Sequence, residues 1–350
     1  MVRFSWPHPK TRSTVLPQAP GPLLVRKPRM FQGLVGQSRA MRRLYWKIEA
    51  LAETRGTVLI IGESGTGKEL VARAIRDCAD PNSPFVALNC AAIPKDLIES
   101  ELFGHRKGAF SGANAEHLGL FRAAHGGTLF LDEVTEMALE MQSKLLRAVQ
   151  ERTVRPVGSL REVPIDVRLI SSTNRDPEQA VRSGNLRQDL YYRLQANVIE
   201  VPPLRHRLED IPELVEHFLA LFNRTLRPKV VVEGIAEDAL AALKRHTWPG
   251  NVRELSNAIE SAFTFSRATI IGLKDLPASV MESHPSLGSQ ESANKSPETA
   301  HALTIGSFAE AEREVITRAL RRTGGNKAAA AALLGISRKK LYARVDKYGI

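Results

Sequence analysis

The chain has 350 residues, of which 43% are apolar and 25% are charged, and its formal net charge is +11. This length predicts about two domains, and this composition excludes a chain that is disordered throughout. The two cysteines, Cys78 and Cys90, are too few for a disulfide framework or a four-ligand zinc site, and no segment approaches the roughly 18 apolar residues of a membrane span. We therefore expect a cytoplasmic protein.

Positive charge gathers at both ends of the chain. Residues 1–30 contain six Lys and Arg and no acid, and residues 306–350 contain ten Lys and Arg against four acids. Residues 31–283 are neutral in sum, and residues 284–305 carry −1. A neutral body with a basic segment at each end indicates binding to nucleic acid more than a uniformly basic surface would.

The patterning along the chain predicts five segments. Residues 1–30 hold six prolines and no apolar block long enough for a signal peptide, so we expect a basic, proline-rich tail. Residues 31–203 alternate short apolar strands with helical patterns, which predicts an α/β subdomain built on a parallel sheet. Residues 204–283 favour a helical subdomain, residues 284–305 a flexible linker, and residues 306–350 a small all-α domain. The strands are expected at residues 58–61, 85–88, 128–131 and 167–171, and helices at residues 70–76 and 211–222.

A glycine-rich loop follows the first of these strands. Its sequence is Gly62-Glu63-Ser64-Gly65-Thr66-Gly67-Lys68-Glu69, and a predicted helix comes next. Strand, loop and helix in this order are typical of a P-loop, whose backbone N–H groups surround phosphate oxygens while the lysine reaches the β- and γ-phosphates. The position after Lys68, which usually holds a Ser or Thr that ligates Mg²⁺, is Glu69.

Two acids end another predicted strand, about sixty residues further along the chain. This strand runs through Gly126-Gly127-Thr128-Leu129-Phe130-Leu131 into Asp132-Glu133. A strand end in a parallel sheet opens onto the ligand crevice, where Asp132 can hold Mg²⁺ and Glu133 can polarise the attacking water. Together the two motifs predict hydrolysis of a nucleoside triphosphate.

From Phe31 to about Met281 the chain resembles the AAA+ transcriptional activators of sigma-54 RNA polymerase, the NtrC-type bacterial enhancer-binding proteins. The P-loop of that family also has Glu after Lys, so Glu69 fits the family. The family's GAFTGA loop corresponds to Gly108, Ala109, Phe110, Ser111, Gly112 and Ala113, with Ser111 in place of the usual Thr. The resemblance implies that this loop contacts the sigma factor, and an apolar tip on a glycine-flanked loop independently favours a partner contact.

The resemblance also implies roles for single residues. Asn89 matches an asparagine that senses the nucleotide state beside Glu133, and Thr173 with Asn174 resembles sensor I. Arg187 and Arg193 match the arginines proposed as fingers that reach the neighbouring subunit, while Arg253 matches sensor II. The implied cofactors are ATP and Mg²⁺, and the implied assembly is a homo-oligomeric ring, usually a hexamer.

The basic C-terminal segment predicts a helix-turn-helix. A helix with an apolar stripe ends at Gly324-Gly325, Asn326 can cap a second helix at residues 327–334, and Ser337 can cap a third after Gly335. This pattern resembles the Fis-type DNA-binding domain. We expect the third helix to contact double-stranded upstream DNA through Ser337, Arg338, Lys339, Lys340, Tyr342, Arg344 and Lys347.

The sequence thus predicts an ATP-hydrolysing activator that binds enhancer DNA and remodels sigma-54 holoenzyme. Two alternatives are a DNA-binding regulator with a vestigial ATPase domain and an AAA+ remodeller of another substrate, and neither would need the loop around Phe110. Most family members carry an N-terminal receiver or sensory domain, whereas only the basic tail precedes Phe31 here. Control by a partner in trans, control by expression level, and a chain that is a fragment of a longer protein stay open.

Overall fold

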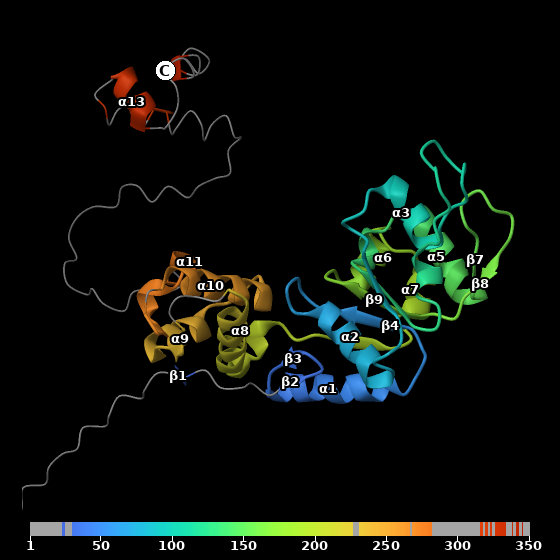
Figure 1. The fold of residues 1–350 in the computed structure, drawn as a ribbon, viewed down its shortest axis with the longest axis horizontal. Coiled ribbons are helices and arrows are strands. Elements are labelled where there is room, and N and C mark those ends of the chain that lie inside the picture. Colours follow the sequence, from blue (N-terminus) through green and yellow to red (C-terminus); the bar gives the residue numbers. More distant parts are fainter. Residues whose placement is uncertain are drawn as a thin grey trace, which may run out of the picture. The chain divides into compact units, whose positions relative to one another are not determined.

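The computed structural model describes residues 23–24, 30–226, 231–266, 268–281, 316–317, 319–320, 323, 326–333, 338, 341–342 and 345. The chain divides into two compact units, residues 1–285 and 286–350 (Figure 1). None of the helices in these described residues is long and apolar enough to cross a bilayer.

A five-stranded parallel sheet lies at the centre of the first unit. Its strands are β4 (Val58–Ile61), β5 (Phe85–Asn89), β6 (Thr128–Asp132), β9 (Arg168–Thr173) and β10 (Val198–Glu200). Their order across the sheet is β10-β4-β9-β6-β5, and every neighbouring pair is parallel. The predicted α/β class is confirmed, and each of the four predicted strands overlaps an observed one. The fifth strand, β10, was not predicted individually.

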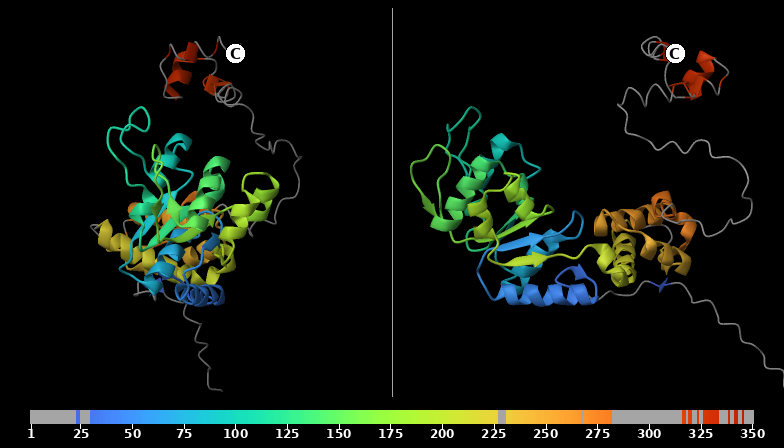
Figure 2. Two further views of the ribbon diagram at one scale, coloured as in Figure 1. Left: turned by 90° about the vertical axis from the view of Figure 1, so that its right-hand side faces the viewer. Right: turned by 180° about the vertical axis from the view of Figure 1, so that it is seen from behind.

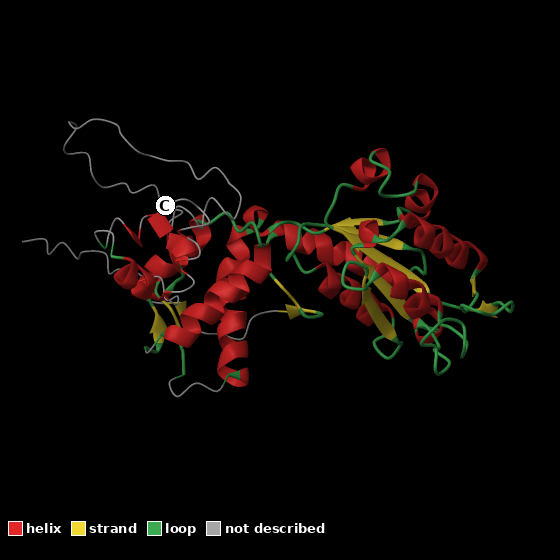
Figure 3. Cartoon of the chain, turned by 90° about the horizontal axis from the view of Figure 1, so that it is seen from above, coloured by secondary structure: helices red, strands yellow, loops and turns green. Residues whose placement is uncertain are grey.

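Helices cover both faces of this sheet (Figure 3). One face carries α1 (Arg39–Ala52) and α2 (Lys68–Ala79), and the other carries α3 (Lys95–Phe103), α4 (Leu120–Ala123), α5 (Leu139–Glu151), α6 (Pro177–Arg182) and α7 (Gln188–Leu194). Along β6, Phe130 packs into the core under α1 and α2, whereas Leu129 and Leu131 pack into the core under α5 and α7. Successive side chains of a strand point to opposite faces, so a sheet buried on both faces needs continuously apolar strands.

Two short hairpins and a 3₁₀ turn lie between the main strands and helices of this subdomain. β2 (Met30–Phe31) and β3 (Leu34–Val35) form a hairpin before α1, and the 3₁₀ turn η1 (Val134–Glu136) follows β6. β7 (Thr153–Val154) and β8 (Val163–Pro164) form a second hairpin after α5. The loop of residues 104–119, between α3 and α4, extends away from the sheet beside the loop of residues 155–162, between β7 and β8 (Figure 2).

A helical lid completes the first unit. It contains η2 (Leu204–His206), η3 (Leu208–Asp210), α8 (Ile211–Thr225), α9 (Glu237–Arg245), α10 (Asn251–Phe265), η4 (Leu273–Asp275) and α11 (Ala278–Met281). Its hydrophobic core contains the fully buried Trp248 and three phenylalanines, Phe218, Phe222 and Phe263. The predicted helical character of this segment is therefore confirmed.

The lid also holds a small sheet that the sequence did not predict. β11 (Gly234–Ile235) lies between β12 (Ile270–Ile271) and β1 (Leu23–Leu24). Leu23 and Leu24 fall within the predicted N-terminal tail, and the structure instead pairs them antiparallel with the lid. The physical reason is that β11 has an edge on this side whose backbone groups need partners, and a two-residue strand satisfies them.

The second unit contains α13 (Lys327–Leu333), which agrees with the predicted second helix of the C-terminal domain. Asn326 caps it as expected, because its Oδ1 accepts hydrogen bonds from the backbone N–H groups of Ala328 and Ala329 at 3.1 and 3.2 Å. Among the described residues of this unit, the buried side chains are those of Ile316, Ala319, Ala330, Ala331, Leu341 and Val345. Arg338 and Tyr342 are exposed, as expected for a DNA-contacting face, whereas Ser337, Lys339, Lys340, Arg344 and Lys347 lie outside the described residues.

Candidate active site

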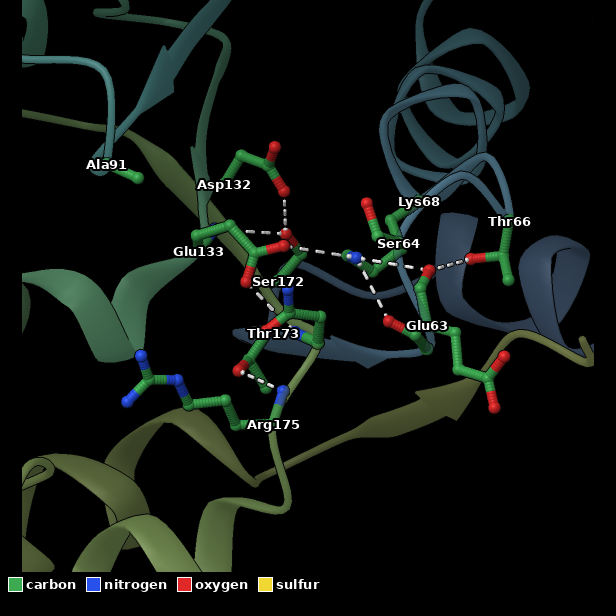
Figure 4. Close-up of polar contacts among 12 residues, drawn as sticks. Glu63, Ser64, Thr66, Lys68, Ala91, Asp132, Glu133, Ser172, Thr173 and Arg175 are labelled. Atoms are coloured by element: carbon green, nitrogen blue, oxygen red, sulfur yellow. Dashed lines mark hydrogen bonds and ion pairs between the residues drawn. The ribbon is translucent and has the colours of Figure 1, made fainter. Parts of the chain in front are cut away.

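The phosphate loop joins β4 to α2, in the order that the sequence predicts. Gly65 and Gly67 adopt φ values of 77° and 99°, in the left-handed region that favours glycine. Lys68 begins α2 and is 7% exposed. Its Nζ donates to the carbonyl of Gly62 at 3.0 Å and lies 3.3 Å from Oε1 of Glu133 (Figure 4). The structure therefore brings the lysine of the first motif and an acid of the second motif together.

The two acids stand together at the carboxyl end of one strand, β6. Asp132 ends β6 and receives a hydrogen bond from Nδ2 of Asn89 at 3.1 Å. The hydroxyl of Ser172 donates to the same carboxylate (Figure 4). Glu133 follows with φ of 54°, and its Oε2 accepts from the backbone N–H of Asn174 at 3.0 Å. Among the described residues, the side chain of Asp132 thus has neutral partners, while Glu133 is held beside Lys68.

Asn89 and Thr173 occupy this strand edge in ways that the family resemblance did not specify. Asn89 bonds to Asp132, although the resemblance implied a place beside Glu133. Thr173 is fully buried, its hydroxyl lies 3.0 Å from the hydroxyl of Thr135, and it accepts from the backbone N–H of Arg175 at 3.1 Å. In this arrangement Thr173 holds the turn after β9, and the backbone of Asn174 positions Glu133.

The start of the lid helix α10 clamps the phosphate loop. Nη1 of Arg253 donates to the hydroxyl of Ser64 at 3.1 Å, and the backbone N–H groups of Val252 and Arg253 donate to the carbonyl of Gly65 at 3.1 and 3.3 Å. A side chain at position 65 would bring a Cβ within 2.2 Å of the carbonyl oxygen of Gly250. Gly65 is therefore required both by its φ and by the approach of the lid.

Glu63 connects the same loop to two parts of the lid. Its carboxylate forms a two-pronged ion pair with Arg205, at 2.6 and 2.7 Å, and accepts from Nδ2 of Asn251 at 3.1 Å. The hydrogen bonds from Arg205 and Asn251 lower the pKa of Glu63 to about 2. Asn251 is fully buried, and its Oδ1 also accepts from the backbone N–H of Leu204 at 2.8 Å.

Sequence reasoning did not single out Arg205, Asn251 or Ser172. The sequence features that could have identified two of them are polar residues next to apolar ones. Ser172 lies within a buried strand, and Asn251 comes directly before the apolar stripe of α10. A buried polar side chain needs a hydrogen-bond partner, and here the partners are the phosphate loop and Asp132.

The carboxylate of Asp132 fits a role as an Mg²⁺ ligand. Carboxylate oxygens are the ligands that Mg²⁺ prefers, and no cationic side chain pairs with Asp132 in the part of the chain that the structure describes. Glu69 does not add a ligand here, because its side chain is exposed and pairs with Arg73 at 2.7 Å on the outer side of α2. The residues present therefore fit a metal held mainly by Asp132, substrate oxygens and water.

Cys90 lies directly behind the two acids without taking part in their chemistry. Burial raises the pKa of its thiol to about 12, and the charges of Asp132 and Glu133 add to the rise. The reactive form of a cysteine is the thiolate. A thiol that stays protonated at neutral pH is excluded as a nucleophile at this site.

Arg187 is the residue directly before α7, and Arg193 lies in the last turn of that helix. The guanidinium of Arg187 pairs with Asp189 at 2.7 and 3.0 Å on the surface. Arg193 is exposed, and within the described residues its side chain forms no ion pair. No hydrogen bond or ion pair joins either side chain to Lys68 or Glu133 in the described parts of the chain, so the site of a single chain lacks them.

The loop of residues 104–119, here called the Phe110 loop, carries the sequence Gly108 to Ala113 at its tip. The backbone N–H of Gly108 donates to the carbonyl of Ala113 at 2.8 Å and closes the tip. Phe110 is 41% exposed, and the edge of its ring packs on His105 with ring centroids 5.0 Å apart. The expected exposed apolar tip is present, although its ring is partly supported by the loop's own base.

A second apolar side chain lies on the neighbouring loop. Leu160, in the loop of residues 155–162, is 95% exposed. The two loops are in contact, since Arg106 N–H donates to the carbonyl of Val157 at 3.0 Å and a Cβ at Gly158 would lie 2.8 Å from Cβ of Ala109. The sequence analysis did not identify Leu160, because a single leucine in a loop has no periodic pattern.

Three family matches cover most of the chain. Residues 34–200 match the sigma-54 interaction domain, residues 205–293 the AAA+ ATPase lid domain, and residues 307–348 the bacterial regulatory proteins of the Fis family. The transcriptional regulatory protein ZraR of Salmonella typhimurium is 47% identical over 316 residues, which are 90% of this chain and 68% of ZraR. The DNA-binding transcriptional regulator NtrC of Azospirillum brasilense is 42% identical over 332 residues, covering 89% of this chain and 68% of NtrC.

Solved structures agree with these matches. The crystal structure of NtrX from Brucella abortus in complex with ATP is 34% identical, with a TM-score of 0.66, and the match covers 91% of this chain and 69% of that chain. The ADP complex of the same protein is 35% identical, also with a TM-score of 0.66, covering 91% of this chain and 70% of that chain.

Proposed function

Because the chain belongs to the family of sigma-54-dependent transcriptional activators of the NtrC type, we propose that the cluster of Lys68, Asp132 and Glu133 is the ATPase centre that drives its action on RNA polymerase. Members of this family bind enhancer DNA, hydrolyse ATP and act on the sigma-54 holoenzyme, and this chain is such an activator. The finer proposals concern which residues perform each step, the metal, the ring and the location.

The observation that carries the proposal is the 3.3 Å contact between Lys68 and Glu133 at the carboxyl edge of the sheet. A lysine at the start of α2 meets the β- and γ-phosphates, and the backbone N–H groups of residues 62–67 surround them. Glu133 then stands beside the γ-phosphate, where it orients and polarises the attacking water. Asn174 fixes the orientation of Glu133 through its backbone N–H.

Asp132 would hold Mg²⁺, which supplies charge neutralisation at the β- and γ-phosphate oxygens when it is bound. Asn89 and Ser172 hold the carboxylate of Asp132 in place through neutral hydrogen bonds, so they leave its charge available. Arg253 and Asn251 join the lid to the phosphate loop, so nucleotide in the loop and the angle of the lid are mechanically linked.

The two remaining arginines support assembly into a ring. Arg187 and Arg193 lie apart from the site of their own chain, so we propose that at least one of them completes the site of a neighbouring subunit. An interface that joins unlike surfaces closes into a ring when its rotation closes, and a hexamer is the usual ring in the family. We also propose that the protein acts in the cytoplasm, where bacterial RNA polymerase is found.

Two substitutions test the assignment of the ATPase centre. Lys68→Ala should abolish ATP binding because the lysine meets ground-state phosphates, whereas Glu133→Gln should bind ATP and lose turnover because Glu133 acts on the water. Nucleotide binding is measured by titration with a fluorescent ATP analogue, and turnover by phosphate release. Substantial hydrolysis by the Glu133→Gln protein would remove Glu133 from its assigned role.

Phosphate release and open-complex formation, each measured with and without sigma-54 holoenzyme, address the two alternatives. A vestigial ATPase domain would give no turnover under either condition, and a remodeller of another substrate would hydrolyse ATP without any effect on promoter opening.

A further inference from the structure

The outer side of α1 carries a group of cations that the ATPase centre does not use. Met41, Leu44 and Ile48 recur at three- and four-residue spacing and are buried against the sheet. The opposite side of the helix is exposed, and besides Arg39, Glu49 and Ala50 it carries Arg42, Arg43, Trp46 and Lys47. We call these four residues the α1 basic face. Figure 1 shows α1 along an outer edge of the first unit.

The α1 basic face lacks partners within the described residues. No ion pair among those residues involves Arg42, Arg43 or Lys47. The indole of Trp46 is 68% exposed, whereas Trp248 in the lid is fully buried. Unpaired cations around an exposed aromatic ring are typical of a binding surface for an anionic partner.

The sequence before α1 adds to this charge. Residues 1–48 contain ten Lys and Arg, six of them before residue 31 and four after it, and the first acid of the chain is Glu49. Residues 31–283 are neutral in sum, so the cations of α1 are a local concentration and not part of a generally basic surface. The positions from Arg42 to Lys47 extend over about 7.5 Å of the helix axis.

We propose that the α1 basic face binds the backbone phosphates of double-stranded DNA, as a second contact besides the C-terminal helix-turn-helix. A duplex presents a phosphate charge about every 1.7 Å along its axis, so some phosphates lie opposite the unpaired cations of a rigid helix wherever it docks. An acidic protein surface would instead need carboxylates placed opposite each of these cations. DNA held by the C-terminal domain is also at a raised effective concentration for every other surface of the same chain. Phosphate contacts of this kind add affinity and orientation without reading sequence.

The salt dependence of DNA binding tests this proposal on the full chain. The variant Arg42→Gln/Arg43→Gln/Lys47→Gln removes three charges and keeps residues of similar helix propensity. Its affinity for a labelled 60-base-pair duplex is compared with the unmodified chain by fluorescence anisotropy from 50 to 200 mM KCl. If each cation meets one phosphate, the slope of log K against log salt becomes shallower by about 2.7, which is 0.9 for each lost contact.

A matched control removes the same charge from the lid. Lys244→Gln/Arg245→Gln/Lys274→Gln changes three exposed cations of α9 and η4, and its salt slope should equal that of the unmodified chain. Equal slopes for the two triple variants would overturn the proposal. So would an α1 variant that binds DNA normally and loses affinity for sigma-54 holoenzyme, because the partner would then be an acidic protein surface.

Photo-crosslinking locates the contact directly. A benzophenone amino acid at position 46 should crosslink to the labelled duplex, and the same group at position 265, where Phe265 of the lid is 77% exposed, should not. Equal crosslinking at the two positions would contradict a contact at α1. The inference does not depend on the assigned ATPase residues, and ATP turnover should be unchanged in the α1 variant, so failure of one proposal is distinguishable from failure of the other.

Discussion

The carboxylate of Glu63 ties the phosphate loop to the lid, and its charge is what holds the two together. Arg205 comes from η2 and Asn251 from the start of α10, so one side chain of the loop contacts two separate segments of the lid. The carboxylate is exposed enough for water to screen the ion pair, so its strength depends on geometry more than on burial. Protonation of Glu63 should therefore loosen the lid.

The pH dependence of stability gives a test at this residue. The folded chain lowers the pKa of Glu63 from 4.5 to about 2. A lowered pKa stabilises the fold above the unfolded value, and that contribution is lost as the pH falls through the folded value. The unmodified chain should thus resist urea better than Glu63→Gln at pH 7, and the gap between the two midpoints should narrow below about pH 4.5.

The partner residue provides the control for this experiment. In an Arg205→Gln background, Glu63→Gln should change the urea midpoint much less, because the two side chains form one interaction. A gap that stays constant from pH 7 to pH 3 would mean that Glu63 acts through packing and not through its charge.

At the scale of single residues, the sequence predicted Lys68, Asp132, Glu133 and Asn89, and it missed Ser172 and Asn251, which form hydrogen bonds to Asp132 and to the phosphate loop. Lys68 and Asp132 are fixed by the chemistry of triphosphates and lie in recognisable local strings. Ser172 contacts a residue 40 positions away, and Asn251 contacts one 188 positions away. Such pairs exist only after the sheet order and the lid position are set, so no local pattern encodes them.

Among the elements, the Phe110 loop is the one that we propose as the contact with the sigma factor. Gly108 and Gly112 have positive φ values, and a Cβ added at either position would meet no atom within 4 Å. The tip is therefore open, and its backbone hydrogen bond between Gly108 and Ala113 keeps it compact. Leu160 on the adjacent loop enlarges the apolar area available to a partner.

We expect Phe110→Ala to separate ATP turnover from promoter opening. Phe110 has no group for phosphoryl chemistry, so turnover and assembly should persist. Its ring can bury apolar area worth about 1.5 to 3 kcal/mol, so nucleotide-dependent binding to sigma-54 should weaken roughly 10- to 150-fold. The measurement is ATP turnover and open-complex formation on the same preparations.

Two further variants control for the loop itself. Leu118→Ala truncates an exposed apolar side chain at the base of the same loop and should leave promoter opening intact, and Ser111→Thr should be tolerated. If Phe110→Ala opens promoters at the unmodified rate, the tip of this loop is not the working contact with the sigma factor.

Elements with a long repeating pattern were predictable, and very short ones were not. The strands of the central sheet and the helix α8 have sustained apolar patterns in the sequence, and the structure confirms these elements. β1 and β12 have two residues each, which is too short for any periodicity to appear. Their pairing with β11 depends on the tertiary structure of the lid, which a local pattern does not encode. For this reason Leu23 and Leu24 belong to the lid and not to the predicted tail.

At the scale of the whole molecule, the proposed ATPase centre of a single chain lacks, among the described residues, an arginine that would face the γ-phosphate opposite Lys68. Lys68 approaches from the loop side, but the two arginines with this expected role lie elsewhere in the chain. Asp189 holds Arg187 on the surface, where a neighbouring subunit can reach it, and Arg193 is exposed one helical turn or more further along α7. An arginine finger contributes about a thousandfold or more to the rate of hydrolysis.

Mixing of inactive variants tests whether that charge comes from a neighbour. Lys68→Ala and Arg187→Ala proteins should each be nearly inactive, yet in a 1:1 mixture roughly one quarter of the interfaces join an intact Lys68 to an intact Arg187. Phosphate release should therefore recover towards that fraction, and the same experiment with Arg193→Ala identifies which arginine acts across the interface. A mixture of Lys68→Ala with Glu133→Gln is the control, because both changes lie on the nucleotide side and no mixed interface is intact. Absence of recovery in rings shown to mix would mean that the arginines act within their own subunit or are structural.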